Sequence, residues 1–213
     1  MSNKSNTCKV VLLGDSGVGK TCLIARYICD SFDHNCPTTN GASFVTKELT
    51  LDDGKTIALD IWDTAGQEKY KSLTKFFYKE ASIAILVYDI TKKETFTNLK
   101  QYWTQQLKEY ASKNIIVGIA GNKCDLYDKE QVNDEEVKEY ADKMGAYFVL
   151  TSAKNNIGIK DLYKTLTIKY VNSIDKIVDK NNNNNSYEIE ESNSIRICSV
   201  DEKSLGVEKK NCC

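Results

Sequence analysis

The sequence predicts an α/β fold in which a mostly parallel, six-stranded sheet lies between helices. Short β-rich runs alternate with helical patterns over residues 8–175, and two of these runs are continuously apolar. Such alternation favours a doubly wound sheet, and continuously apolar strands are typical of a sheet covered on both faces. The first run ends at a glycine-rich turn. Ligands of such folds bind at the carboxyl ends of the strands, so this turn is the first place to look for a site.

The first part of the chain predicts a strand, a helix and a hairpin. The strand covers residues 8–13, and the helix covers about residues 20–29, where apolar side chains recur at spacings of three and four. Residues 43–51 and 55–62 form two more strands around the turn Asp52-Asp53-Gly54.

The second part of the chain continues the alternation. Residues 82–88 and 114–120 are the two continuously apolar runs, so we expect them to be central parallel strands. The remaining periodic segments predict helices and a final strand: helices over residues 94–111, about 134–144 and about 158–175, and a strand over 147–151.

Three segments are expected along the chain: a flexible N-terminus (1–7), one domain (8–175) and a disordered, hypervariable tail (176–213). The tail contains the run Asn181–Asn185 and few large apolar residues, so it cannot bury a core. Its six basic and seven acidic residues predict only weak attraction to anionic lipid. Its distinctive feature is the terminal pair Cys212-Cys213.

Composition excludes several classes of protein. A net charge of −1 and a pI near 6.0 give no general attraction to nucleic acid, which normally requires a basic stripe. The eight cysteines show neither the C-x-x-C spacing of zinc sites nor the density of a disulfide scaffold, which fits a reducing cytosol. No stretch approaches the roughly 20 apolar residues of a membrane-spanning helix, so membrane attachment needs another device.

A phosphate-binding motif follows the first strand and opens the first helix. The motif G-x-x-x-x-G-K-[ST] is present as Gly14-Asp15-Ser16-Gly17-Val18-Gly19-Lys20-Thr21. Consecutive main-chain N–H groups and the helix N-terminus compensate phosphate charge. Lys20 would reach the β- and γ-phosphates, and the Thr21 hydroxyl would ligate Mg²⁺. We expect nucleotide contacts from Asp15, Ser16, Gly17, Val18, Gly19, Lys20, Thr21 and Cys22. The alternative is a glycine turn with a solvated lysine.

A second motif identifies the base. Asn122-Lys123-Cys124-Asp125 follows a buried strand, and the Asp125 carboxylate can accept hydrogen bonds from N1–H and the exocyclic amine of guanine. Adenine has no N1–H, so an acceptor would face an acceptor there. Thr151-Ser152-Ala153-Lys154, after the last strand, could supply a main-chain N–H to the guanine O6 and a packing lysine. Taken singly, Asn and Asp after strands commonly start turns.

Together these motifs resemble those of Ras-superfamily GTPases over residues 8 to about 175. The resemblance implies a P-loop NTPase fold of the small G-domain type. It implies that guanine is bound by Asn122, Lys123, Asp125, Ser152, Ala153 and Lys154.

The resemblance also assigns a hydrolytic element, Asp63-Thr64-Ala65-Gly66-Gln67. Asp63 would hold Mg²⁺ through water, the Gly66 N–H would contact the γ-phosphate, and Gln67 would orient the attacking water. Lys20, Gly66 and Gln67 are therefore the expected catalytic residues. No arginine stands out as a built-in finger, so we expect one from a partner. Gln67 on its own could equally be a solvated glutamine.

The first switch of the family matches the segment before the second strand. Thr39 lies eighteen residues after Thr21, the spacing of the family's threonine that binds Mg²⁺ and senses the γ-phosphate. Phe32 matches the aromatic residue that packs on the guanine; the alternative is a core phenylalanine.

Several details resemble the Rab branch, including Trp62 to Glu68, the segment Leu86 to Thr91 and the terminal cysteines. Rabs carry a geranylgeranyl group on each such cysteine, and two lipids give stable anchoring where one does not. The alternative for Cys212 and Cys213 is a pair of free thiols. The entry to the second strand resembles early-endosomal Rabs, and the residues Phe44, Trp62 and Phe77 match the family's effector-contacting aromatics or else form core.

Two positions depart from the Rab pattern. Asn40 stands where Rabs usually carry isoleucine, and Lys69 stands where they usually carry arginine. The loss of an exposed apolar contact at Asn40 puts the choice of effector or exchange factor in doubt, whereas nucleotide chemistry should be unaffected.

The resemblance implies a GDP/GTP switch that hydrolyses GTP slowly and recruits effectors for vesicle trafficking on the endocytic pathway. The expected partners are an exchange factor, a GTPase-activating protein, a GDP-dissociation inhibitor or escort protein, and effectors. We expect a monomer on the cytoplasmic face of endosomal membranes, with a cytosolic pool. Two alternatives remain at this point: an ATP-dependent P-loop enzyme, and a nucleotide-binding module with negligible hydrolysis.

Overall fold

The computed structural model of the protein describes residues 7–37, 39, 41–64 and 77–191, with side chains up to residue 176. The chain divides into two units, Met1–Ser173 and Ile174–Cys213. The first unit contains the sheet and the site described below.

The sheet confirms the predicted α/β fold. Its strand order is β2-β3-β1-β4-β5-β6, with β2 antiparallel to β3 and the other pairs parallel. The strands are β1 (Thr7–Leu13), β2 (Ala42–Thr50), β3 (Thr56–Thr64), β4 (Ile83–Asp89), β5 (Ile116–Asn122) and β6 (Tyr147–Thr151). The order reverses at β1, so the carboxyl end of β1 lies at the point where such sheets bind ligands.

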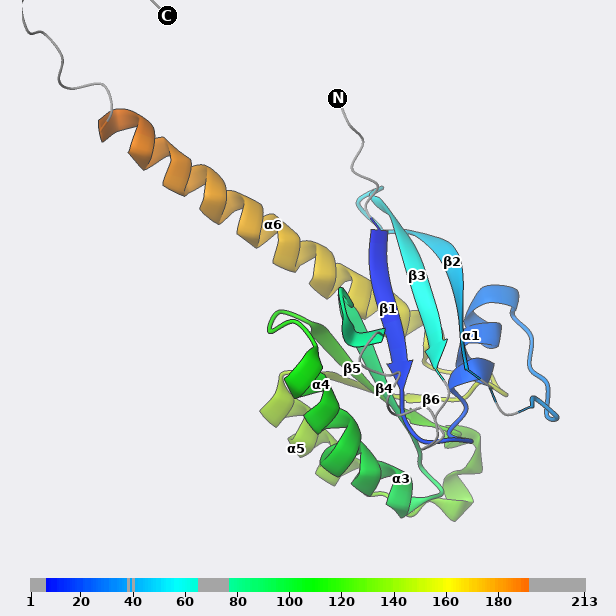
Figure 1. The fold of residues 1–213 in the computed structure, drawn as a ribbon. Helices are drawn as coiled ribbons and strands as arrows, with labels where there is room; N and C mark the ends of the chain where they lie inside the picture. Colours follow the sequence, from blue (N-terminus) through cyan, green and yellow to red (C-terminus); the bar gives the residue numbers. More distant parts are fainter. Residues whose placement is uncertain (1–6, 38, 40, 65–76, 192–213) are drawn as a thin grey trace, which may run out of the picture. The chain divides into compact units, whose positions relative to one another are not determined.

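Helices cover both faces of the sheet (Figure 1). α1 (Lys20–Cys29) and α6 up to Ser173 lie on one face. On the other face lie α3 (Lys93–Asn98), η2 (Leu99–Trp103), α4 (Thr104–Tyr110) and α5 (Asp134–Met144). A 3₁₀ segment, η3 (Cys124–Lys129), follows β5, and α6 runs over Ile159–Glu191.

The core consists of two apolar layers, because successive side chains of a strand point to opposite faces. Val10 and Leu12 of β1 pack under α1 and α6, whereas Val11 and Leu13 pack under the helices of the other face. The strands are thereby fixed from both sides, so the loops at their carboxyl ends extend from a rigid frame.

Two helices differ from the sequence prediction. The single helix expected over residues 94–111 contains a π-helical turn, in which the Thr104 N–H bonds the Leu99 carbonyl. Apolar periodicity does not reveal one extra residue within a continuous helix. The last helix continues to Glu191 rather than ending near residue 175, and no glycine or proline interrupts residues 159–191. The tail over 176–213 stays a prediction.

Candidate nucleotide-binding site

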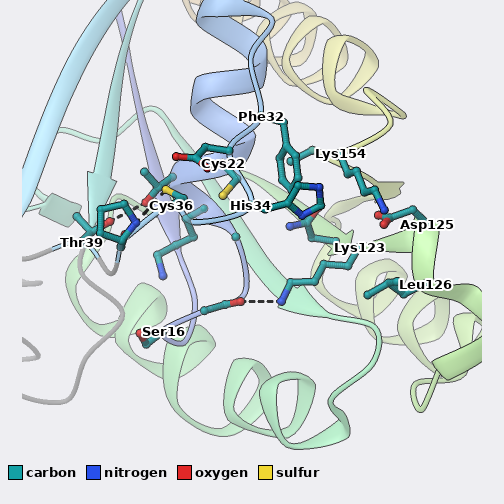
Figure 2. Close-up of a pocket in the computed structure, with 18 of the residues that line it drawn as sticks. Ser16, Cys22, Phe32, His34, Cys36, Thr39, Lys123, Asp125, Leu126 and Lys154 are labelled. Atoms are coloured by element: carbon teal, nitrogen blue, oxygen red, sulfur yellow. Dashed lines mark hydrogen bonds between the residues drawn. The ribbon is translucent and has the colours of Figure 1, made fainter.

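A pocket of about 390 Å³ lies where the carboxyl ends of the parallel strands meet (Figure 2). In this view Thr39 lies at one end of the pocket and Asp125 at the other. The pocket brings together residues predicted from separate motifs: Ser16, Gly17, Gly19, Lys20, Thr21, Cys22, Phe32, Thr39, Asn122, Lys123, Asp125, Ala153 and Lys154.

The loop between β1 and α1 requires glycine at two positions. Gly14 has φ +147°, and a Cβ there would lie 2.2 Å from the Val87 carbonyl oxygen. Gly19 has φ +97°, and a Cβ there would lie 2.4 Å from Asn122 Nδ2. Side chains at either position would push the loop away from the strands. The glycines thus let the main chain lie close to the β4 and β5 ends.

Lys20 is buried at the base of this loop, with 5% of its surface exposed. Its Nζ donates to the carbonyl oxygens of Gly14 (2.7 Å) and Asp15 (2.9 Å). Burial lowers the pKa of Lys20 to about 8, although the Asp63 and Asp15 charges oppose this shift. A buried ammonium held mainly by carbonyl oxygens is well placed to bind an anion.

The three predicted magnesium ligands meet beside Lys20. Thr21 Oγ1 donates to Asp63 Oδ2 (2.7 Å), Thr39 Oγ1 donates to the same atom (3.2 Å), and the two threonine oxygens lie 2.6 Å apart. Among the residues that the structure describes, none donates a hydrogen bond to the buried Asp63 Oδ1, and burial raises the pKa of this carboxyl. Hydroxyl and carboxylate oxygens are the ligands that hard cations take, so the arrangement fits Mg²⁺.

At the base end, the Asp125 carboxylate is held by Ser152, whose Oγ donates to Asp125 Oδ1 (2.6 Å). Asn122 is buried, and its Nδ2 donates to the Val18 carbonyl oxygen (2.8 Å) while its Oδ1 accepts from Thr151 Oγ1 (3.3 Å). Asn122 therefore connects the base loop, the segment after β5 that begins at Asn122, to the phosphate loop between β1 and α1. Asp125 belongs to this base loop, so its position is fixed relative to the phosphate loop.

Lys123 connects the same two loops at the surface. Its backbone is left-handed (φ +68°), and its Nζ donates to the Gly17 carbonyl oxygen at 2.8 Å (Figure 2). The same Nζ pairs with Asp89 Oδ2 at 2.6 Å, and Asp89 is only 1% exposed. Thr91 also donates its N–H and its hydroxyl to Asp89 Oδ1.

Sequence reasoning missed Asp89 and Arg26. Asp89 ends β4 just as other site residues end their strands, and that position was the available signal. Arg26 of α1 donates from Nε to the Ala153 carbonyl (2.7 Å) and from Nη2 to the Lys154 carbonyl (3.2 Å). Its guanidinium thus supports the loop over Ser152–Lys154, and the supply of an arginine finger by a partner stays a prediction.

Two residues of the phosphate motif do not line the pocket with their side chains. Val18 is buried in the core. The Asp15 carboxylate accepts hydrogen bonds from Asn98 Nδ2 (2.7 Å) and Trp103 Nε1 (2.8 Å), on the face of the sheet that α3 and η2 cover. Their expected contacts with nucleotide through the main chain stay predictions.

The three predicted effector-contacting aromatics pack together away from the pocket. The ring centroids of Phe44 and Trp62 lie 5.3 Å apart, and those of Trp62 and Phe77 lie 5.9 Å apart. Phe44 is 61% exposed, so the cluster reaches the surface. Lys9 lies over the Trp62 ring.

Four predicted residues lie outside the described residues: Gly66, Gln67, Cys212 and Cys213. Within the described part of the chain, no helix has the length and apolar character that crossing a membrane requires.

The fold and pocket together define a P-loop nucleotide-binding protein whose base end presents an acidic acceptor suited to guanine. The Ras family model matches residues 9–172. Human Ras-related protein Rab-22A is 50% identical over 155 residues, covering 73% of this chain and 79% of that protein. Human Rab-31 is 48% identical over 159 residues (75% and 80%), and Arabidopsis thaliana RABA4b is 43% identical over 168 residues (79% and 74%).

The chain belongs to the Ras family of small GTPases, in its Rab branch. It is a GTP hydrolase that regulates vesicle trafficking. The family, the fold and the enzymatic activity that were predicted from the sequence are thereby confirmed. Members of this family bind GTP or GDP together with Mg²⁺, and work with exchange factors, activating proteins, dissociation inhibitors and effectors.

Proposed function

We propose that this chain is a GDP/GTP switch of endosomal membranes, in which Thr21, Thr39 and Asp63 hold Mg²⁺ and Lys20 holds the terminal phosphates. The observation that carries the proposal is that the Thr21 and Thr39 hydroxyls meet at Asp63 Oδ2 near the buried Lys20 ammonium, while the other carboxylate oxygen, Oδ1, is buried and accepts no hydrogen bond from the described residues. Such an orphaned acceptor is costly unless a cation or donor completes it. When bound, Mg²⁺ would neutralise phosphate charge.

Thr39 supports the switching part of the proposal. Its hydroxyl connects the loop before β2 to Thr21 and Asp63. A γ-phosphate that recruits the Thr39 N–H and hydroxyl would order this loop, and its loss on hydrolysis would release it. Partners that distinguish the two forms would then bind this side of the molecule.

Base selectivity follows from Asp125. Ser152 donates to one carboxylate oxygen, which restrains the rotation of the Asp125 carboxylate at the pocket. A fixed pair of acceptors matches the adjacent N1–H and amine of guanine. We infer that Phe32 and Lys154, which line the same end, pack against the base.

The direct test is nucleotide binding by the purified full chain. Affinities for GDP and ADP are compared with Mg²⁺ and after its removal with EDTA. We expect GDP to bind at least about 1,000-fold more tightly than ADP, since a buried acceptor pair rejects the wrong base by orders of magnitude. Equal affinities would refute the guanine assignment.

The metal assignment is tested with Thr21→Asn. We expect this change to weaken GTP more than GDP, because Mg²⁺ held by Thr21 would neutralise phosphate charge, of which GTP carries more. The matched control is Thr50→Asn at the exposed end of β2, where Thr50 pairs with Thr56 at the amino end of β3, away from the carboxyl ends of the parallel strands that form the pocket. Equal losses of both nucleotides in Thr21→Asn would reject the ligand role.

Hydrolysis is assigned to Gln67 and Gly66 from the motif alone. In single-turnover reactions with and without an activating protein, Gln67→Leu should slow GTP cleavage and leave GDP affinity unchanged. Cleavage at the unaltered rate would remove Gln67 from the catalytic set.

Membrane attachment is assigned to geranylgeranyl groups on Cys212 and Cys213, and effector binding to the exposed cluster of Phe44, Trp62 and Phe77. Removal of the two cysteines should shift the protein to the soluble fraction of cells. Persistent recovery with membranes would reject the lipid anchor.

Imaging of the tagged protein beside organelle markers tests the endosomal assignment.

A further inference from the structure

Asp15 is the second residue of the phosphate loop, and its carboxylate is held by another element. Trp103 Nε1 donates to Oδ1 at 2.8 Å, and Asn98 Nδ2 donates to Oδ2 at 2.7 Å. Both oxygens of the carboxylate therefore have a donor, and both donors lie in the helical segment over Lys93–Tyr110. The phosphate loop is anchored at this end by side chains more than 80 residues away in sequence.

The π-helical turn places Trp103 at this position. One extra residue is accommodated between Leu99 and Thr104, as the Thr104 N–H reaches the Leu99 carbonyl. In an α-helix each residue is rotated by about 100° from the last, so an inserted residue changes the direction of the side chains that follow. Trp103 is 1% exposed, and its indole N–H finds its partner in Asp15. π-Turns within helices occur often at functional sites.

The main chain of Asp15 takes part in the phosphate cradle. Its carbonyl oxygen accepts from Lys20 Nζ at 2.9 Å, beside the Gly14 carbonyl. Asp15, whose side chain is bound by Trp103 of η2, thus positions the Lys20 ammonium through its main-chain carbonyl oxygen. Movement of Asp15 would move one of the two carbonyl oxygens that hold Lys20.

The charge of Asp15 gives the anchoring a second effect. A carboxylate beside a polyphosphate repels it, and the repulsion is greater where water is excluded. Two donors keep the Asp15 charge on the helix side of the loop, outside the residues that line the pocket. Without them the carboxylate could turn toward the nucleotide.

We propose that Asp15 is a positioning residue for the nucleotide, held by Trp103 and Asn98, so that the α3–η2 segment sets the affinity of the phosphate loop. The proposal rests on the proposed function of the pocket. It assigns these three side chains to nucleotide affinity rather than to folding alone. A partner that displaces the α3–η2 segment would therefore weaken nucleotide binding.

The test is a double-mutant cycle read by equilibrium affinity for GDP and GTP and by the GDP release rate. Trp103→Phe removes the indole N–H, and Asp15→Ala removes the acceptor. Trp103→Phe should weaken GTP binding by about tenfold, the value of one hydrogen bond to a charged group, and Asp15→Ala should weaken it at least as much, because it removes the acceptor of both bonds. The double variant should bind as well as Asp15→Ala alone, because without the carboxylate the Trp103 indole has no Asp15 bond left to lose.

Two further variants separate positioning from folding. Asn98→Ala alters an exposed residue and should weaken GTP binding several-fold without affecting folding. Leu107→Ala opens a cavity in the same helical layer, so it should lower thermal stability and leave affinity unchanged.

The outcomes are distinct. If the unaltered chain binds no guanine nucleotide, the proposed function fails. If it binds normally but Trp103→Phe and Asn98→Ala bind equally well, the positioning role alone is overturned. Additive losses in the cycle, or a loss in Leu107→Ala equal to that in Trp103→Phe, would also overturn it.

Discussion

The ion pair between Lys123 and Asp89 makes a quantitative prediction about stability. Asp89 is 1% exposed and the Lys123 side chain is 32% exposed, with 2.6 Å between Nζ and Oδ2. Lys123→Met would remove the ammonium and leave a buried carboxylate without its counter-charge. The loss should therefore appear in the free energy of unfolding, even when no nucleotide is present.

The magnitude follows from burial and from the remaining partners. Breaking a buried ion pair by removing one member costs about 3–5 kcal/mol. Water reaches the lysine side, and Thr91 still donates twice to the other carboxylate oxygen, so we expect about 2–3 kcal/mol. For a domain of this size that lowers Tm by about 4–12 °C.

The assay is urea unfolding in EDTA without nucleotide, followed by circular dichroism. The matched control is Lys164→Met, which breaks an exposed pair with Asp52 (43% and 84% exposed) and should cost under about 1 kcal/mol. Adding Asp89→Asn to Lys123→Met should restore at least half of the loss, because an amide needs no counter-charge. A loss in Lys123→Met no larger than in the control would refute the reasoning.

Two other predictions follow, one from the cysteines of the pocket and one from the ion pair between Lys100 of η2 and Glu136 of α5. Cys22 and Cys36 line the pocket, whereas Cys29 is exposed outside it. Bound GDP should therefore slow maleimide labelling of Cys22 and Cys36 and leave the labelling of Cys29 unchanged, as mass spectrometry of labelled peptides would show. Equal labelling of Cys22 and Cys36 with and without GDP would contradict the assignment of the pocket to nucleotide. The Lys100 ammonium lowers the pKa of Glu136, so this surface pair stabilises the fold above the ordinary pKa of glutamate and loses its effect as pH falls through the lowered pKa. Lys100→Met should cost under about 1 kcal/mol at pH 7 and less at pH 3, as urea unfolding at the two pH values would show, whereas an equal cost at both would refute the pairing.

The order of elements and the loops of the site could be predicted from the sequence, because both depend on local patterns. Apolar runs placed β4 and β5 within two residues of their observed bounds, and the motifs after the strands supplied the pocket's polar groups. Side-chain pairing across elements could not be predicted. Lys123 with Asp89, and Asp15 with Trp103, join residues on different elements whose approach depends on strand order and rotamer. The π turn that directs Trp103 leaves apolar periodicity nearly unchanged, so the pattern gave no signal of it.

The bonds within the site divide it into a fixed part and a responsive part. Asn122 and Lys123 each donate to a carbonyl oxygen of the phosphate loop, so direct bonds connect the loop after β5 to the phosphate loop. Thr39 is held differently, through hydroxyl contacts with Thr21 and Asp63 that a bound metal would replace. The base and phosphate loops, which these bonds hold in place, bind the guanine and the phosphates that GDP and GTP have in common. These two loops therefore cannot distinguish GDP from GTP. Discrimination must come from the element whose bonds change with the ligand, and among the described residues Thr39 meets that condition.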